Sequence, residues 1–143
     1  MKRWIVPAAC VVSLFVYARP ASAQYHGGGP QAESFTVDSA LATQGKRLFM
    51  VRGCAGCHTV GKGDLSAPDL GGLLERRSVA WVQKWLRNPT AMLETDETAK
   101  ELAKRYNNMR MPNLKLSDKE ILALMHHIAE QTAATRQAPP ASQ

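Results

Sequence analysis

One five-residue segment constrains this chain more than any other, the run Cys54-Ala55-Gly56-Cys57-His58. Two cysteines separated by two residues and followed directly by histidine form the attachment pattern of a c-type haem. Each thiolate can add to one vinyl group of the porphyrin, and the adjacent imidazole can bind the iron. The motif therefore predicts one covalently attached haem c, with Cys54 and Cys57 as the attachment points and His58 as an iron ligand.

Other kinds of site for this cysteine pair fit the sequence less well. A thioredoxin-like redox pair has the same spacing but needs a βαβ setting, and no segment here shows the sustained alternation of a strand. A structural zinc site needs four ligands. His126 and His127 carry suitable nitrogens, but their spacing indicates no particular zinc site. Haem attachment is the interpretation that the residues favour.

The N-terminal residues have the composition of a secretory signal peptide. Lys2 and Arg3 form a basic start, residues 4–17 form an apolar run, and Ala21-Ser22-Ala23 is a small-residue cleavage signal. The apolar run is short for a membrane span. We therefore expect residues 1–23 to be cleaved off after Ala23 and the mature protein to work in the periplasm; a retained N-terminal anchor is the alternative.

Removal of this segment changes both the cysteine content and the charge of the chain. Cys10 leaves with it, so the mature chain keeps only Cys54 and Cys57. The full sequence has 18 Lys and Arg against 12 Asp and Glu, and three of the cations lie in residues 1–23. The remaining excess is small, and two haem propionates would cancel most of it. The basic composition of the precursor is therefore no reason to expect nucleic-acid binding.

Composition also divides the rest of the chain. We expect a flexible lead-in over residues 24–36, which contain Gly27-Gly28-Gly29-Pro30. A single folded domain should occupy residues 37–132. Residues 133–143 include Pro139-Pro140 and show no apolar periodicity, so we expect a disordered tail there.

The first and last helices of this domain are predicted by their caps and apolar faces. The first should run over residues 39–52, with Asp38 or Ser39 as its cap. A glycine on its apolar face, Gly45, indicates that another helix crosses very close to it. The last helix should open at the capping box of residues 117–120. Its apolar stripe consists of Ile121, Leu124, Met125 and Ile128.

Between these two helices the sequence predicts a loop and two shorter helices. Residues 61–72 are rich in glycine and contain a proline, which predicts a loop. Ser78 should cap a helix that Asn88-Pro89 stops. Residues 95–106 carry acidic residues first and basic residues last, as the helix dipole favours. No segment alternates as a strand would, so the predicted fold class is all-α.

Residues 39–130 resemble the class I c-type cytochromes, the monohaem cytochrome c family. Residues 45–49 and 53–58 are similar to the first helix and attachment site of that family. Residues 67–70 look like its loop on the histidine side, and residues 111–114 resemble its sixth-ligand segment. The resemblance implies a small cytochrome c fold, in which the N- and C-terminal helices cross and short helices and loops wrap one haem.

The same resemblance implies roles for residues outside the attachment motif. The carbonyl of Pro68 would accept a hydrogen bond from the ligand imidazole, and Leu70 of the same loop would also contact the haem. Met111 would be the axial methionine. A thioether suits iron in both oxidation states and raises the reduction potential, which supports a methionine in a proline-containing loop as a ligand. Met109 is the alternative, as is the absence of any methionine ligand.

The chain departs from the family near its end, at His126 and His127, where an aromatic residue often packs on the first helix. We expect one imidazole to take the place of that aromatic ring and the other to be exposed; haem ligation by either is an alternative. Trp81 and Trp85 lie four residues apart on a predicted helix. We expect them to be core or haem-wall residues.

Filled axial positions would keep substrates from the iron, which predicts a carrier of single electrons and not an enzyme. Expected partners are a quinol-oxidising complex as donor and a terminal oxidase or periplasmic reductase as acceptor. We expect a monomer that binds no nucleic acid, and the sequence allows peripheral membrane association. The alternatives are a five-coordinate haem protein with gas-binding or peroxidase activity, and a haem subunit of a larger redox complex.

Overall fold

The computed structural model describes residues 35–138, and within them the chain forms helices and loops without a β-strand. This confirms the all-α fold class. The predicted signal peptide and the greater part of the lead-in lie outside the described residues. None of the described helices combines the length and apolarity that a membrane crossing requires. The helices are α1 (Ser39–Val51), η1 (Cys54–Gly56), α2 (Leu73–Arg76), α3 (Val79–Arg87), α4 (Pro89–Thr95), α5 (Glu97–Arg105) and α6 (Asp118–Gln137).

Side-chain caps determine where the longer helices begin. Asp38 Oδ1 accepts hydrogen bonds from the amides of Ala40 and Leu41, at 2.8 and 3.0 Å, and so starts α1. At α6 the predicted capping box between Ser117 and Glu120 is present. These contacts satisfy amide groups that have no partner inside the helix. The caps of α3, α4 and α5 are Ser78, Asn88 and Asp96.

Helix α4 is an element that the sequence did not predict. Asn88-Pro89 ends α3, as expected, but the same two residues begin the next helix. Asn88 caps α4 through its side chain, and Pro89 occupies the first helical turn, where the missing amide hydrogen costs nothing. A proline that stops one helix can therefore start another.

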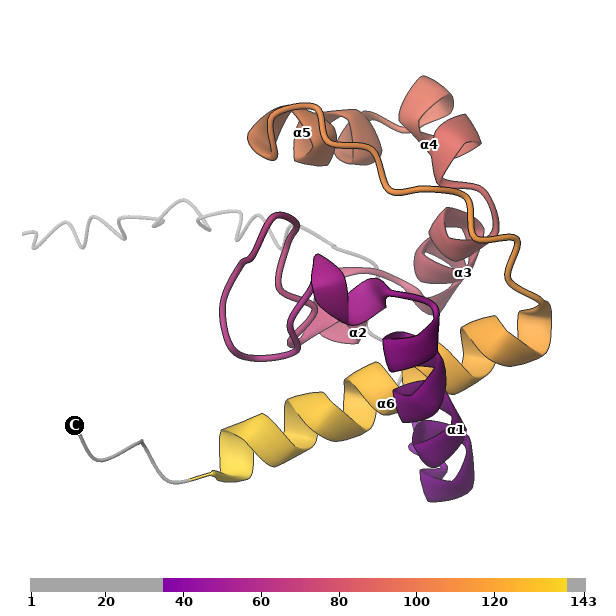
Figure 1. Ribbon diagram of the computed structural model, residues 1–143, viewed down its shortest axis with the longest axis vertical. Helices are drawn as coiled ribbons and strands as arrows, with labels where there is room; N and C mark the ends of the chain where they lie inside the picture. The colour runs from indigo at the N-terminus through magenta and orange to yellow at the C-terminus, as the bar shows by residue number, and fades with distance from the viewer. Residues whose placement is uncertain (1–34, 139–143) are drawn as a thin grey trace, which may run out of the picture.

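Helices α1 and α6 cross in close contact, as Figure 1 shows. A Cβ atom built on Gly45 would lie 1.9 Å from the carbonyl oxygen of Ala123, so only glycine lets the two backbones approach this closely. The ring of His127 meets Phe49 edge-on at the same crossing, with centroids 5.4 Å apart. One imidazole thus takes the position expected for the aromatic ring.

The expectation that the other imidazole is exposed was wrong. His126 is only 7% exposed, and its Nδ1 atom accepts a hydrogen bond of 3.0 Å from the amide of Asp38. Its ring packs on Phe35, with centroids 4.7 Å apart. The reason is that α6 is covered on two sides, by α1 and by the residues just before α1, so neighbouring positions are both buried.

The predicted domain boundaries, residues 37 and 132, are too narrow at both ends. Phe35 packs against His126 and the core, although we expected it in the flexible lead-in. Helix α6 continues to Gln137, so residues 133–137 are helical and the predicted disorder there is wrong. The last turns of α6 have no apolar stripe. They are stabilised instead by contacts of Thr132 and Thr135 with the loop before α2.

The chain between α5 and α6 returns past the middle helices. In Figure 1 this segment, residues 106–117, runs in orange from α5 past α4 and α3 to the start of α6. The side chain of Asn113 donates a hydrogen bond of 3.4 Å to Asn88 between α3 and α4. The segment therefore lies against α3, which brings Met111 next to that helix.

Replacement of Gly45 by alanine tests the crossing. In an exposed helix this change gains about 1 kcal/mol of stability from helix propensity. Here the added methyl meets a backbone carbonyl, so we expect a net loss of about 1–3 kcal/mol or more, as in overpacked cores. Chemical denaturation followed by circular dichroism measures the free energy of unfolding.

Gln44→Ala is the matched control, because Gln44 is exposed on the same helix one residue earlier. We expect this variant to be as stable as the parent protein. A stabilised Gly45→Ala protein would contradict the close crossing.

Candidate metal centre

All the residues that the sequence marks for haem or iron binding line one pocket. The space within it that protein atoms leave free is about 1270 Å³, part of it open to solvent. Most of the other lining side chains are apolar, and they come from the helices α1 to α6, the loop before α2 and the segment between α5 and α6. The six predicted residues in the lining are Cys54, Cys57, His58, Pro68, Leu70 and Met111.

The attachment motif is one tight turn that follows α1 directly. Gly53 adopts a left-handed conformation with φ of 77°, which ends α1 and turns the chain into η1. The amides of Cys57 and His58 both donate to the carbonyl of Cys54, at 3.1 and 2.9 Å. This turn brings the two cysteines and the histidine to the pocket wall together.

The imidazole of His58 is oriented by the backbone of the following loop. Its Nδ1 atom lies 2.7 Å from the carbonyl oxygen of Pro68, the pair that the resemblance implies. A carbonyl oxygen only accepts hydrogen bonds, so Nδ1 must carry the proton. The lone pair is then on Nε2, which is the tautomer that an iron ligand needs.

The two thiols differ in their surroundings. Both Cys54 and Cys57 are free cysteines, the first half-buried and the second exposed. Burial raises the pKa of the Cys54 thiol, although its own backbone hydrogen bond and the charge of Arg52 act in the opposite direction.

The loop that carries Pro68 is built around the carboxylate of Asp69. Five donors from the chain before and after it converge on the two carboxylate oxygens. Nothing in the sequence marks Asp69 for this role, because a single aspartate in a glycine-rich loop carries no signal of how many amides it accepts. The donors are the Thr59 hydroxyl and the amides of Gly61, Lys62, Gly63 and Gly71, with the amides at 2.9, 2.8, 2.7 and 2.5 Å.

These hydrogen bonds determine the ionisation of Asp69. Burial alone would raise the pKa of this carboxyl, but the donors of Thr59 and the surrounding amides outweigh it and hold the pKa well below its usual range. The group is therefore a fixed anion at neutral pH. It holds the loop closed beside the Pro68 carbonyl.

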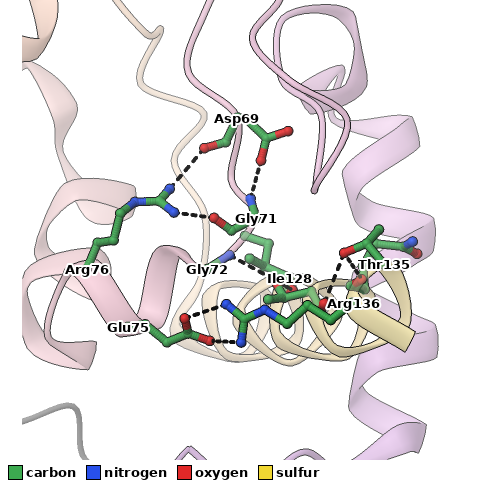
Figure 2. Close-up of polar contacts among 10 residues, drawn as sticks. Asp69, Gly71, Gly72, Glu75, Arg76, Ile128, Thr135 and Arg136 are labelled. Carbon is green, nitrogen blue, oxygen red and sulfur yellow. Dashed lines mark hydrogen bonds and ion pairs between the residues drawn. The ribbon is translucent and has the colours of Figure 1, made fainter. Parts of the chain in front are cut away.

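The same loop is fastened to α2 and α6, as Figure 2 shows. The guanidinium of Arg76 donates to the carbonyls of Asp69, at 3.1 Å, and of Gly71. The amide of Gly72 donates to the Thr132 hydroxyl of α6 at 3.1 Å. The position of the histidine-side loop thus follows from the position of α6.

A second contact joins this loop to the end of α5. The Tyr106 hydroxyl donates a hydrogen bond of 2.6 Å to Asp64, and Asp64 also accepts from the amide of Asp69 at 2.8 Å. Hydrogen bonds from Tyr106 and from this amide lower the pKa of Asp64. Tyr106 itself lines the pocket. The histidine side and the segment that leads to Met111 are therefore connected through one tyrosine.

Met111 and Met109 both line the pocket, but their surroundings differ. Met109 is 50% exposed, whereas Met111 is partly buried and its sulfur accepts a hydrogen bond of 3.1 Å from the indole of Trp85. Trp81 and Trp85 stack on each other with centroids 5.7 Å apart, and both line the pocket. Helix α3 thus supplies an aromatic wall beside Met111.

Comparisons with known proteins agree with this geometry. The family model described as cytochrome c matches residues 42–132. A cytochrome c from Rhodothermus marinus is 25% identical, with a TM-score of 0.64, and the match covers 69% of this chain and 83% of that one. The cytochrome c domain of the pp3183 protein from Pseudomonas putida is 37% identical, with a TM-score of 0.56, over 67% of this chain and 99% of that one. A search of curated proteins finds no match.

The chain belongs to the cytochrome c family, a class of haem-binding electron-transfer proteins. Its cofactor is haem c with its iron, attached covalently, and Cys54 and Cys57 stand in the attachment motif. The residues present fit this group, because two free thiols and an imidazole with an available Nε2 lone pair line one largely apolar pocket.

Replacement of Asp69 by asparagine tests the anion in the loop. Asparagine has one acceptor oxygen where Asp69 has two, so some donors lose their partner, and we expect a loss of about 1–3 kcal/mol at neutral pH. Urea unfolding of the haem-loaded protein across a pH series measures this.

The pH dependence of that loss follows from the lowered pKa of Asp69. The stabilisation is complete above the unfolded-state pKa of about 3.9 and declines as pH falls below it, because the unfolded chain then binds a proton that the folded chain does not. The difference between Asp69→Asn and the parent protein should therefore shrink in acid. Asp118→Asn, at an exposed residue, is the control. A difference that stays constant down to pH 3 would contradict the lowered pKa of Asp69.

Proposed function

We propose that this protein is an exported carrier of single electrons whose haem iron is bound by His58 and Met111. The proposal rests on the observation that both side chains line one apolar pocket. The His58 ring is oriented by its hydrogen bond to the Pro68 carbonyl, and the Met111 sulfur by the hydrogen bond that it accepts from the Trp85 indole. Haem c supplies the one-electron chemistry, cycling between ferric and ferrous iron. The chain supplies the ligands, their orientation and the exclusion of water.

The roles of the pocket residues follow from their chemistry. The Pro68 carbonyl keeps the proton of His58 on Nδ1 and leaves Nε2 to bind the metal. The thioether of Met111 is neutral and soft, and such a ligand raises the reduction potential. Apolar walls from α3 and α6 keep water away, which also favours the state of lower charge. If His58 and Met111 both bound the iron, no site on the metal would be left for a substrate, so the role we propose is that of an electron carrier and not of an enzyme.

Export and partners are the further parts of the proposal. The basic start, apolar run and Ala21-Ser22-Ala23 of the sequence support cleavage after Ala23 and a periplasmic location. Membership of the family implies redox partners. We propose a quinol-oxidising complex as donor and a terminal oxidase or periplasmic reductase as acceptor, with the carrier acting as a monomer.

A second candidate function is that of a haem module within a larger redox assembly. The similar structure from Pseudomonas putida is described as one domain of a larger protein. Purification from the native host under mild conditions separates the two functions. A carrier elutes at the size of the single chain, whereas a module elutes with other redox subunits.

Replacement of Met111 by alanine tests the ligand assignment. A ferric haem with axial sulfur shows a weak absorption band at the red end of the visible spectrum. We expect Met111→Ala to abolish this band and to shift the ferric–ferrous equilibrium toward ferric by about tenfold or more, which is about 59 mV for a one-electron couple. Visible spectroscopy and a redox titration measure both effects.

Met109→Ala is the matched control, because Met109 lines the same pocket two residues earlier. It should keep both the band and the potential. If Met109→Ala loses the band and Met111→Ala keeps it, Met109 is the ligand; if the parent protein has no such band, a five-coordinate haem is indicated.

The mass of the purified protein tests attachment and export together. Protein collected from the periplasm should begin at Gln24 and exceed its polypeptide mass by one haem. A Cys54→Ala, Cys57→Ala double variant should lose the haem in acidic acetone, whereas the parent protein retains it. A polypeptide of bare mass with free thiols would contradict the covalent attachment.

A further inference from the structure

One hydrogen bond joins the two sides of the pocket that carry His58 and Met111. The Tyr106 hydroxyl donates to Asp64 at 2.6 Å, between residues that lie 42 positions apart in the sequence. Within residues 35–138, no other hydrogen bond connects the histidine-side loop with the segment of residues 106–117. The bond raises the pKa of the Tyr106 hydroxyl above its ordinary value, so this group keeps its proton at neutral pH and donates.

The acceptor of this bond belongs to the loop that orients His58. The other oxygen of Asp64 accepts from the amide of Asp69 at 2.8 Å. Asp69 directly follows Pro68, whose carbonyl oxygen lies 2.7 Å from the Nδ1 atom of His58. The carboxylate of Asp64 is therefore held in place by the same stretch of backbone that orients the imidazole.

The donor lies where the segment of Met111 begins. Tyr106 is the C-cap of α5, and its carbonyl accepts a hydrogen bond of 2.9 Å from the amide of Met109. Between them Asn107 and Asn108 adopt left-handed conformations, with φ of 55° and 58°. Asparagine tolerates this region better than most residues, and two successive residues there give the turn a definite shape. The position of Tyr106 therefore determines where the chain turns toward Met111.

The bond lies at the rim of the pocket. Asp64 is exposed and does not line the pocket, whereas the half-buried Tyr106 lines it together with Pro68 and Met111. The loop of Asp64 is fastened separately to α2 and α6. Movement of the Met111 segment away from the pocket would therefore leave this loop behind and separate Tyr106 from Asp64.

We propose that Tyr106 is a positioning residue, which through its hydrogen bond to Asp64 keeps the Met111 segment closed over the haem iron and limits the binding of outside ligands. This inference rests on the proposed ligation by Met111. An outside ligand binds only after Met111 has left the iron, so its apparent affinity is its intrinsic affinity multiplied by the fraction of open molecules. The hydrogen bond is present only in the closed form and lowers that fraction.

Imidazole is a suitable probe, because it competes with a methionine for ferric iron. Tyr106→Phe keeps the ring in the pocket and removes only the hydroxyl. We expect imidazole to bind the ferric, haem-loaded Tyr106→Phe protein about threefold to tenfold more tightly than the parent protein, which is the usual effect of one exposed hydrogen bond on an equilibrium. A titration followed by visible spectroscopy measures the affinity.

Lys100→Gln is the matched control on the same helix. It removes another contact of α5, the ion pair of 2.7 Å between Lys100 and Glu97, and neither of these residues lines the pocket. Imidazole should bind this variant as it binds the parent protein. Equal tightening in both variants would mean that any loosening of α5 exposes the iron, and would overturn the proposal.

The partner of the hydroxyl is tested in a second background, Asp64→Ala. This change also removes the acceptor of the Asp69 amide, so the informative quantity is the further effect of Tyr106→Phe in that background. We expect a further change of less than about twofold, because the bond is already absent. A further change as large as in the parent background would mean that the hydroxyl acts on another group, such as the haem, and would overturn the proposal.

The red absorption band of the ferric protein separates this inference from the proposed function. If the parent protein has the band but imidazole binds Tyr106→Phe no more tightly, ligation by Met111 survives and only the role of Tyr106 fails. If the parent protein lacks the band, the ligation fails and this inference fails with it.

Discussion

The distance at which α1 and α6 cross governs the rest of this structure. At Gly45 the backbones come so close that any side chain would meet the carbonyl of Ala123. The end of α1 leads directly into the attachment motif, and the start of α6 follows directly on the segment of Met111. Arg52 and Glu120 join these two ends in an ion pair. One contact between two helices thus sets the places from which the attachment motif and the segment of Met111 depart.

The carboxylate of Asp69 fixes the histidine-side loop by accepting several hydrogen bonds. Residues 61–72 form no helix, and hydrogen bonds to Asp69 hold this loop in shape. The carboxylate gathers amides from both sides of its own loop, and α2 and α6 hold the assembled loop in place. The Pro68 carbonyl is thereby held beside His58, where it accepts a hydrogen bond from Nδ1 and leaves Nε2 free for the metal.

The methionine side is organised by aromatic rings instead. Helix α3 is short, yet its two tryptophans lie on one face and stack, and they form a wall beside the segment of Met111. Tyr106 then joins that segment to the loop of Asp69 through Asp64. The His58 ring donates a hydrogen bond to the Pro68 carbonyl, and the Met111 sulfur accepts one from an indole, so each side of the pocket restrains one of these side chains. Tyr106 connects the two sides.

Local signals in the sequence were reliable where the physics is local. The cysteine–histidine motif acts within a few residues, and so do the helix caps at Asp38, Ser78 and Ser117. The glycine at the crossing is also a direct signal, because it marks a place where no side chain fits. The same local logic missed α4, because a proline after asparagine both stops and starts a helix. It also ended the last helix too early.

By itself, then, the sequence determined the all-α class, the haem attachment motif and the need for a close helix crossing at Gly45. Only the tertiary structure decided that both His126 and His127 are buried, that Asp69 gathers five donors, and that the Met111 sulfur has Trp85 as its partner. The physical reason is distance along the chain. The residues that surround these side chains come from other elements, and the pattern within one segment does not predict which residues of another segment will contact it.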